Sequence, residues 1–521
     1  AVNSAAQAGK APAPSAPKEA ELKAAERIAI DYGDAAELAD KSAKALKALA
    51  ADQPLLWKAL RSQGVFRGSG APGKIAFLYT GQGSQYVNMM KSFRAAEPLV
   101  AETFAEADRV LSHLLGKPLS DFIFVNSQDP AALAKAENDL RQTAITQPAV
   151  LATDISLTKL MASYGVKPDM VMGHSLGEYG ALVAAGCLPF EDALEAVSAR
   201  GREMTRVSMK DNGKMAAVFA PIKAIEEVIS KVDGYVVIAN INSNQQAVVG
   251  GESPAVEAAV KRLKEAGYEA VLLSVSHAFH TSIVAPAGEP LRNMLMRLRL
   301  TTPKLPIIAN VNGEFYPTDN KPAMLDILAQ QVAAPVQFVK GLETLYNAGA
   351  RIFCEMGPKK ALQGFADEVL GDRPGVLSLF SNHPKIGDVV AFNQALCGMY
   401  ASGIGAAASE EKPAVIAEAH LMTKSVQHAE LAQHLQSSVS PSSTMLGGNQ
   451  YETLGRMMAE VFERAGQMMS RGGAAPVTEP PVVTGAGLGL PGTERVFDDR
   501  NLRRILNGEQ LIGPMPDRYR R

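Results

Sequence analysis

One serine stands in a sequence context that could make it a nucleophile. Residues 173–177 read Gly-His-Ser-Leu-Gly, and they follow the apolar run Asp-Met-Val-Met at 169–172. A strand that enters a helix through two glycines forces the central serine onto a tight turn, with its hydroxyl exposed at the helix N-terminus. The next stretch, 178–186, is rich in small residues, so this helix can pack closely on a sheet. Ser175 is therefore a candidate nucleophile for acyl chemistry, although G-x-S-x-G also recurs by chance in a chain with 44 glycines.

This serine needs a base, because a hydroxyl at its free pKa is a poor nucleophile. The chain contains eight histidines. His174 precedes the serine on the strand-turn-helix elbow formed by residues 173–177, where its side chain points away from the hydroxyl. Most of the other histidines lie in helical or linker sequence. His277 and His280 remain, just after a strand predicted at 270–275. The residues alone do not decide between them, and no acidic residue nearby is an evident partner for the imidazole.

Further segments accompany the serine in a fixed order. Residues 77–86 read Phe-Leu-Tyr-Thr-Gly-Gln-Gly-Ser-Gln-Tyr, Arg200 lies 25 positions after the serine, 276–280 reads Ser-His-Ala-Phe-His, and 355–362 reads Glu-Met-Gly-Pro-Lys-Lys-Ala-Leu. Together with the elbow they closely resemble the malonyl-CoA:acyl-carrier-protein transacylases and the acyltransferase domains of polyketide and fatty-acid synthases. The resemblance covers about residues 74–400.

This resemblance implies roles for particular residues. It implies that His280 is the base for Ser175 and that a backbone carbonyl, instead of the carboxylate of a triad, orients its ring. The oxyanion hole would consist of the backbone N–H of Leu176, the residue after the nucleophile, and that of Gln82. Arg200 would bind a substrate carboxylate, which a planar guanidinium matches with two donors. A malonyl group carries that carboxylate, whereas an acetyl or fatty acyl group does not.

The neighbour of the base carries a second specificity prediction. In the resembling family, His-Ala-Phe-His accompanies malonyl and Tyr-Ala-Ser-His accompanies methylmalonyl. A bulky Phe279 beside the acyl α-carbon would leave no room for a methyl branch. Because a methyl-sized difference is worth only about 1–3 kcal/mol, this residue predicts a preference for malonyl-CoA and not strict selection.

The elements that must position these residues predict an α/β fold. Strands at 74–79 and 169–173 alternate with helices such as 147–164, which indicates a parallel sheet with buried strands. From 213 to 275 the order becomes β-α-β-β-α-β, the ferredoxin-like arrangement. Strands at 307–311, 352–355 and 376–380 then return to the first sheet. We expect a hydrolase-like parallel-sheet large subdomain with an inserted ferredoxin-like small subdomain.

Composition shifts predict the domain limits, and both ends read as cuts through a longer polypeptide. We expect an Ala/Pro-rich linker at 1–20, an α/β linker subdomain at 21–70, the large subdomain at 74–205 and 276–400, the small subdomain at 206–275, a linker with one helix at 401–481, and the start of a ketosynthase-like domain at 482–521.

Charge and composition narrow the partners. The 52 Lys and Arg residues nearly balance the 54 Asp and Glu residues, so bulk charge gives no reason to expect nucleic-acid binding. The 3 cysteines lie far apart in apolar stretches, which predicts buried thiols in a reducing compartment. The sequence has no metal-ligand spacing and no Walker loop. It also has no apolar run of membrane-spanning length and no signal pattern, so we expect a cytoplasmic protein that does not enter a membrane.

These features predict a transferase that moves a malonyl unit from CoA to Ser175, and then to the phosphopantetheine thiol of an acyl carrier protein, in polyketide or fatty-acid biosynthesis. Such ping-pong chemistry has a covalent intermediate and needs no bound cofactor. The alternatives are a serine hydrolase or thioesterase acting on acyl thioesters, the same transferase using methylmalonyl-CoA, and a non-catalytic docking module. A hydrolase would gain nothing from a carboxylate-binding Arg200, and the intact Ser175, His280 and Gln82 argue against a docking module.

Overall fold

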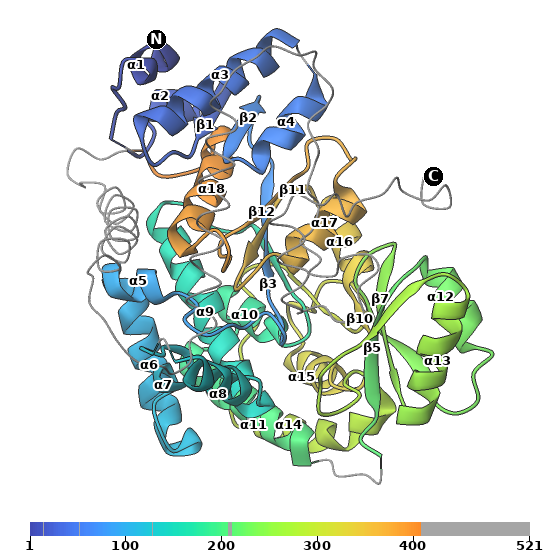
Figure 1. The fold of residues 1–521 in the computed structure, drawn as a ribbon. Helices are drawn as coiled ribbons and strands as arrows, with labels where there is room; N and C mark the ends of the chain where they lie inside the picture. Colours follow the sequence, from blue (N-terminus) through green and yellow to red (C-terminus); the bar gives the residue numbers. More distant parts are fainter. Residues whose placement is uncertain (14, 52, 128, 207–210, 408–521) are drawn as a thin grey trace, which may run out of the picture. The chain divides into compact units, whose positions relative to one another are not determined.

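The structure is a computed structural model, and it describes residues 1–13, 15–51, 53–127, 129–206 and 211–407 (Figure 1). Most of the predicted linker at 401–481 lies outside the described residues, as does the ketosynthase-like segment predicted at 482–521. Among the described helices, none combines the length and the hydropathy that a membrane span requires. The predicted domain limits remain predictions.

A five-stranded parallel sheet forms the centre of the large subdomain. Its strands, in the order β12-β11-β3-β4-β9, are β12 (Leu377–Phe380), β11 (Ala350–Met356), β3 (Lys74–Tyr79), β4 (Met170–Gly173) and β9 (Ile307–Ile308). Every residue of β3 after Lys74 is buried. A near-continuous apolar strand of this kind is what a parallel sheet covered on both faces requires. The predicted α/β fold class is therefore confirmed.

Alternate side chains of the central strand β3 enter two different cores. Phe77 and Tyr79 pack with α9 (Thr143–Ser163), whereas Ala76 and Leu78 face α16 (Phe338–Asn347) and α17 (Ala361–Leu370). This follows from the two-residue period of a strand. Most of α9 is buried, as expected of a helix that is apolar on every side.

Further helices complete the large subdomain. They are α5 (Lys91–Ala96), α6 (Pro98–Leu115), α7 (Ser120–Ile123), α8 (Pro130–Leu140), α10 (Gly177–Ala184), α11 (Phe190–Arg206), the 3-10 helix η1 (Ser282–Ala287), α14 (Gly288–Leu295), α15 (Lys321–Gln330) and α18 (Asp388–Ala401). Helices α10 and α11, which carry residues of the site described below, both contact α9.

The small subdomain has the predicted β-α-β-β-α-β order. Its elements are β5 (Lys214–Phe219), α12 (Ile222–Ile229), β6 (Val236–Ile241), β7 (Gln246–Gly251), α13 (Ser253–Glu265) and β8 (Glu269–Leu272). The four strands pair antiparallel in the order β6-β7-β5-β8, which is the ferredoxin-like topology. A fifth strand, β10 (Val336–Gln337), pairs parallel with β6, although it belongs to the chain that has already returned to the large subdomain. The sequence did not predict this strand, which links the two subdomains.

The N-terminal part forms a small α/β unit. Strand β1 (Glu26–Ile30) pairs antiparallel with β2 (Val65–Ser69), next to α2 (Glu19–Leu22), α3 (Ala35–Ala51) and α4 (Pro54–Arg61). Within the predicted linker 1–20, helix α1 (Val2–Gln7) packs on α3, where Asn3 Nδ2 donates to Ala39 O and Ser42 Oγ at 2.9 Å each. This part of the segment is thus a docked helix and not a spacer, because its alanines favour a helix and Ala6 finds a place to be buried.

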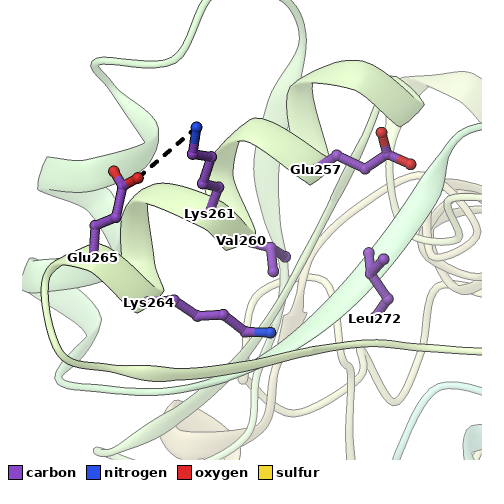
Figure 2. Close-up of a pocket in the computed structure, with 6 residues that line it drawn as sticks. All are labelled: Glu257, Val260, Lys261, Lys264, Glu265 and Leu272. Atoms are coloured by element: carbon purple, nitrogen blue, oxygen red, sulfur yellow. Dashed lines mark ion pairs between the residues drawn. The ribbon is translucent and has the colours of Figure 1, made fainter.

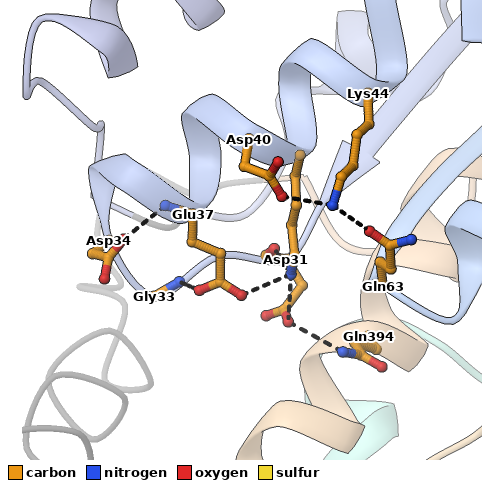
Figure 3. A network of polar contacts seen from close by, with 9 residues as sticks. Asp31, Gly33, Asp34, Glu37, Asp40, Lys44, Gln63 and Gln394 are labelled. Atoms are coloured by element: carbon orange, nitrogen blue, oxygen red, sulfur yellow. Dashed lines mark hydrogen bonds and ion pairs between the residues drawn. The ribbon is translucent and has the colours of Figure 1, made fainter. Parts of the chain in front are cut away.

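Polar contacts attach this N-terminal unit to the large subdomain. Asp31, which follows β1, accepts a hydrogen bond from Gln394 Nε2 of α18 at 3.4 Å (Figure 3). The same carboxylate lies 3.8 Å from the ammonium of the buried Lys41, which also pairs with Glu37 at 3.0 Å. Nearby, Lys44 bridges Asp40 and Gln63. A buried lysine of this kind is tolerated because it is paired.

Candidate active site

Ser175 sits on a strained turn between β4 and α10. Its backbone φ is +54°, in the left-handed region that side chains other than glycine rarely adopt. The flanking glycines are required by packing. A Cβ at Gly173 would lie 2.0 Å from Glu178 N, and one at Gly177 would lie 2.1 Å from Tyr79 O. The two glycines therefore let the elbow approach its own helix and the end of β3.

Two amide side chains hold this strained serine. The Ser175 N–H donates to Asn310 Oδ1 at 2.6 Å, and Asn310 Nδ2 donates to Gly173 O at 2.7 Å. Gln331 Nε2 donates to Ser175 O at 2.6 Å. The elbow is thus fixed on both sides of its central residue. Sequence reasoning missed Asn310 and Gln331, because they lie 135 and 156 positions from the serine in mostly apolar segments that carry no recognisable motif.

The imidazole of His280 contacts the serine hydroxyl. Its Nε2 lies 2.6 Å from Ser175 Oγ, while its Nδ1 lies 3.0 Å from Gln331 O and 3.1 Å from Ala334 O. Carbonyl oxygens only accept, so Nδ1 carries the proton and Nε2 is free to accept from the hydroxyl. The other candidate, His277, has its Nδ1 3.0 Å from Ser276 Oγ instead. The geometry thus brings His280, and not His277, to the serine.

The surroundings of His280 favour its neutral form. Burial lowers the pKa of this imidazole to about 3, with further lowering from the charges of Arg200 and His174. The two backbone carbonyls at Nδ1 act in the opposite direction. Near neutral pH the ring can therefore accept a proton from the serine. His174 itself points away from the hydroxyl, with its Nε2 2.7 Å from Asn242 Oδ1 of the small subdomain.

Arg200, from α11, is buried beside the serine with only 2% of its surface exposed. Its Nη2 lies 3.4 Å from Ser175 Oγ and 3.2 Å from Gln331 Oε1. Its Nε is buried without a hydrogen-bond partner among the described residues. Burial also lowers the pKa of this guanidinium. A buried cation with an unused donor is costly unless an anion or another acceptor joins it.

A buried carboxyl lies on the other side of this network. Glu178, in the first turn of α10, accepts from Tyr316 Oη and from Gln331 Nε2, the latter at 2.9 Å. Burial raises the pKa of Glu178 to about 7, although these hydrogen bonds and Arg200 act to lower it. Gln331 therefore connects Glu178, Arg200 and the serine backbone. Sequence reasoning treated Glu178 only as part of a helix.

Of the two predicted oxyanion donors, Leu176 lies on the elbow itself and Gln82 lies on a neighbouring turn. Leu176 immediately precedes α10, so its N–H is one of the groups for which a helix offers no internal acceptor. Gln82 belongs to the glycine turn after β3, and a Cβ at Gly81 would lie 2.6 Å from His174 O. This turn is therefore in van der Waals contact with the elbow. The Gln82 side chain donates to Thr143 Oγ1 at 3.4 Å.

The remaining predicted residue, Phe279, is 8% exposed and belongs to the core of the large subdomain. Its ring centroid lies 6.1 Å from that of His277. The catalytic and binding roles predicted for the site residues remain predictions, since they concern interactions that arise only when substrate binds. The residues are Ser175, His280, Leu176, Gln82, Arg200 and Phe279. Within the described residues, no three His, Cys, Asp or Glu side chains are arranged to hold a metal ion.

A shallow groove of about 500 Å³ lies on the small subdomain (Figure 2). It is lined by α13 and β8, with the ion pair of Lys261 and Glu265 at its rim. None of the predicted site residues lines it. Its charges are mixed in sign, and its lining includes no serine, threonine or cysteine.

Comparisons with known proteins point to one family. The family model described as "Acyl transferase domain" matches residues 76–374. The chain is 34% identical over 301 residues to the malonyl CoA-acyl carrier protein transacylase of Bacillus subtilis, covering 57% of this chain and 90% of that protein. It is 32% identical over 352 residues to the spectinabilin polyketide synthase system protein NorB of Streptomyces orinoci, covering 66% of this chain but only 16% of NorB. Among solved structures, the acyltransferase domain from the second module of the salinomycin polyketide synthase has a TM-score of 0.60 and 31% identity, covering 74% of this chain and 84% of that domain.

Proposed function

The chain belongs to the acyl transferase domain family, and we propose that it moves a malonyl group from CoA, through an ester on Ser175, to the phosphopantetheine thiol of an acyl carrier protein. The family assignment makes the chain an acyltransferase. The malonyl group and the carrier protein are taken from the name of the Bacillus relative. Neither substrate requires a cofactor bound to the enzyme, because the thioester itself supplies the activated acyl group.

The observation that carries this proposal is the convergence of two side chains, those of His280 and Arg200, on the hydroxyl oxygen of Ser175. Ser175 Oγ lies 2.6 Å from His280 Nε2 and 3.4 Å from Arg200 Nη2. The first contact suits a nucleophile with its base. The second contact supports Arg200 as the group that would bind the carboxylate of an acyl chain attached to the same oxygen.

In the first half-reaction, His280 Nε2 takes the hydroxyl proton while Ser175 Oγ attacks the thioester carbonyl. The N–H groups of Leu176 and Gln82 receive the negative charge on the carbonyl oxygen, a contribution of about 3 kcal/mol per donor in comparable sites. The carbon–sulfur bond then breaks, and the CoA thiolate takes the proton from His280. The carbonyls of Gln331 and Ala334 keep Nδ1–H in place, so the ring works without a carboxylate.

In the second half-reaction the same groups act in reverse. The pantetheine thiol gives its proton to His280 Nε2, and its sulfur attacks the malonyl ester. Collapse of the tetrahedral intermediate transfers the malonyl group to sulfur, and Ser175 recovers its proton from His280. His280 thus acts as base and then as acid in both half-reactions of this ping-pong mechanism.

Substrate choice follows from Arg200 and Phe279. The buried guanidinium would pair with the malonyl carboxylate, whereas an acetyl group would leave its Nε without a partner. Phe279, adjacent to the base, would favour malonyl over methylmalonyl by restricting the space at the α-carbon.

The setting of the domain is also part of the proposal. The chain spans only 16% of NorB, so a polyketide or fatty-acid synthase with a neighbouring ketosynthase is proposed by analogy. The described cysteines, Cys187, Cys354 and Cys397, are all free thiols, which supports a reducing, cytoplasmic location.

Intact-protein mass spectrometry tests the proposal. The protein is mixed briefly and separately with malonyl-, methylmalonyl- and acetyl-CoA, with Ser175→Ala as the control. We expect a malonyl-sized adduct on the unmodified protein only, and little adduct from the other two thioesters. Release of free CoA and malonate without an adduct would instead indicate a hydrolase. Equal loading from acetyl-CoA would contradict the role of Arg200 while leaving the serine chemistry standing.

A further inference from the structure

The segment 355–362 that joins β11 to α17 takes no part in the chemistry above, although it packs on the turn that carries Gln82. A Cβ at Gly357 would lie 2.2 Å from Thr80 Oγ1, so this segment and the end of β3 are in tight contact. One side chain also crosses between them. Lys359 Nζ donates to Gly83 O at 2.9 Å, joining residues 276 positions apart.

Lys359 makes this contact from a strained backbone. Its φ is +70°, a conformation that glycine adopts freely and a lysine does not. Five non-glycine residues of the described chain have a positive φ, and two of them are Ser175 and His280. Backbone strain of this kind persists only where the surroundings impose it, and it concentrates at functional sites. A glycine at this position would relieve the strain but could not donate to Gly83.

The turn that receives this bond needs support. Gly83 has a φ of +104°, and no atom lies within 4 Å of the position that its Cβ would take. A turn flanked by two glycines has many accessible conformations, so its N–H groups are not held in direction by the chain itself. The bonds from Ser84 Oγ to Gly81 O and from Gly83 N to Gln85 Oε1 lie within the turn, and the Gln82 side chain reaches Thr143 Oγ1 of α9 at 3.4 Å. The ammonium of Lys359 adds a shorter bond from the body of the subdomain to the backbone of the turn, at Gly83 O.

We propose that Lys359 is a positioning residue, which fixes the turn Gly81–Gln82–Gly83 through the Gly83 carbonyl and so directs the Gln82 N–H at the oxyanion. This inference rests on the proposed function. It predicts that the effect appears in the chemical step, because the Gln82 N–H would meet its charge only in the transition state. Binding of malonyl-CoA should be unaffected.

The chain allows a design that separates positioning from general stability. Lys359→Gly removes the donor and relieves the strain, Lys359→Met removes the donor and keeps the strain, and Lys359→Arg keeps a cationic donor. Exposed Lys360 provides the matched control as Lys360→Met. Each variant is mixed rapidly with malonyl-CoA, and the reaction is quenched and followed by mass spectrometry. This gives the rate of ester formation at saturation and the malonyl-CoA concentration that gives half of that rate. Thermal unfolding gives the midpoint.

We expect the maximal rate of ester formation to fall ~10-fold in Lys359→Gly and Lys359→Met, a part of the loss seen when an oxyanion donor is removed outright. The half-saturating concentration should not change, and Lys359→Arg and Lys360→Met should retain the rate. The thermal midpoint of Lys359→Gly should equal or exceed that of the unmodified protein, so activity and stability move in opposite directions.

Two results would overturn this inference. One is a normal rate in both Lys359→Gly and Lys359→Met. The other is a lower rate in Lys359→Gly together with a lower thermal midpoint, which would indicate a merely structural lysine. Both are distinct from a failure of the proposed function, in which the unmodified protein itself would form no malonyl ester.

Discussion

Arg200 carries a positive charge in a buried position, where an unpaired charge is costly. This cost is why we expect it to select acyl groups that carry a carboxylate. The guanidinium is 2% exposed, and Gln331 Oε1 is a neutral partner for one of its nitrogens. Glu178 contributes a favourable charge interaction, but burial holds the pKa of that carboxyl near 7, so its negative charge is only partly present at neutral pH. The site therefore keeps a positive charge that a bound carboxylate would neutralise.

Arg200→Ala should invert the substrate preference. Loss of charged hydrogen bonds to the malonyl carboxylate is worth about 1.5–3 kcal/mol, which slows malonyl loading ~10–100-fold. Acetyl loading should rise relative to malonyl loading, because no buried charge is then left unpaired. Rates of adduct formation from both thioesters measure the change, with Arg206→Ala as control, since that side chain is on the same helix but 72% exposed. An unchanged malonyl-to-acetyl ratio in Arg200→Ala would contradict the assignment.

His280 should remain neutral throughout the physiological pH range. Its pKa is lowered to about 3, so it carries its charge only in strongly acidic solution. In a proton NMR titration, the imidazole resonance that is absent from a His280→Ala variant should keep its chemical shift between about pH 8 and pH 5. A midpoint near the ordinary imidazole value of 6.5 would show that the base is not desolvated as the structure indicates.

The sequence predicts the reacting groups better than it predicts the groups that hold them. Ser175 stands in a pattern whose glycines have a steric reason, so the nucleophile can be recognised locally. His280 could be separated from His277 only by family resemblance, because the choice depends on where Gln331 and Ala334 present their carbonyls. Asn310 and Gln331 carry no local signal at all, since their partners are backbone atoms of a turn far away in the chain.

The turn at Ser175 depends on glycines, because a side chain at these positions would clash with neighbouring backbone. A Cβ at Gly177 would meet the backbone carbonyl of Tyr79, which β3 fixes in the sheet and which cannot move aside. Gly364, in α17, has no atom within 4 Å of its virtual Cβ. The two glycines are therefore a matched pair, one required by packing and the other not.

Gly177→Ala should lower the free energy of unfolding by about 2–3 kcal/mol, as expected for overpacking against backbone. Gly364→Ala should raise it by up to about 1 kcal/mol, because alanine favours a helix more than glycine does. Urea unfolding followed by circular dichroism measures both. If Gly177→Ala were as stable as the unmodified protein, the close approach of α10 to β3 would be wrong.

The buried carboxyl of Glu355, which accepts a hydrogen bond from the first turn of α17, should make the free energy of unfolding depend on pH. Glu355, at the end of β11, accepts the N–H of Gln363 at 2.7 Å, and burial raises its pKa to about 8 from its ordinary 4.5. The groups that bear on its charge are Lys360, which acts to lower its pKa, and Asp154, whose own pKa is raised by burial and by Glu355. Because the folded-state pKa is raised, the stabilisation is complete below pH 4.5 and is lost as the pH rises through about 8.

The free energy of unfolding of the unmodified protein, measured with urea, should therefore fall between pH 5 and pH 8, by up to about 1.4 kcal/mol per pH unit for this group. In Glu355→Gln the fall should be smaller, because the amide oxygen can still accept the Gln363 N–H but does not ionise. Asp154 and Glu178, whose carboxyl pKa values are also raised by burial, would contribute to the slope that remains. Parallel curves for the two proteins would show that Glu355 ionises normally.

Elements were predictable where burial repeats along them. Strand β3 was predicted at its observed limits because its apolar run is continuous, and the small-subdomain order followed from alternating short strands and helices. Strand β9 is shorter than predicted, ending at Ile308, since Asn310 turns inward to hold the elbow. Strand β10 has only two residues and exists through its pairing with β6, so no periodicity in its own sequence could reveal it.

At the scale of the described molecule, the N-terminal unit and the large subdomain meet at the end of α18. Arg27 is 8% exposed, and its guanidinium donates to Ala401 O and Gly70 O at 2.8 Å each and to Ala24 O. Ala401 is the last residue of α18, whose final carbonyls have no partner within the helix. One side chain of the N-terminal unit thus completes a helix of the large subdomain.

This junction should contribute to stability without entering the chemistry. Arg27→Met would leave the buried carbonyl of Ala401 without its donor, at about 1–3 kcal/mol if no water replaces it, so the urea midpoint should fall. Lys23→Met, which removes only an exposed ion pair with Glu19, should leave it nearly unchanged. Below the unfolding transition, malonyl loading by Arg27→Met should match that of the unmodified protein, because the hydrogen bonds of Arg27 go to Ala401, Gly70 and Ala24 and to none of the predicted site residues. A normal midpoint would mean that the two parts do not stabilise each other, whereas slower loading by folded Arg27→Met would mean that the junction shapes the site through α18.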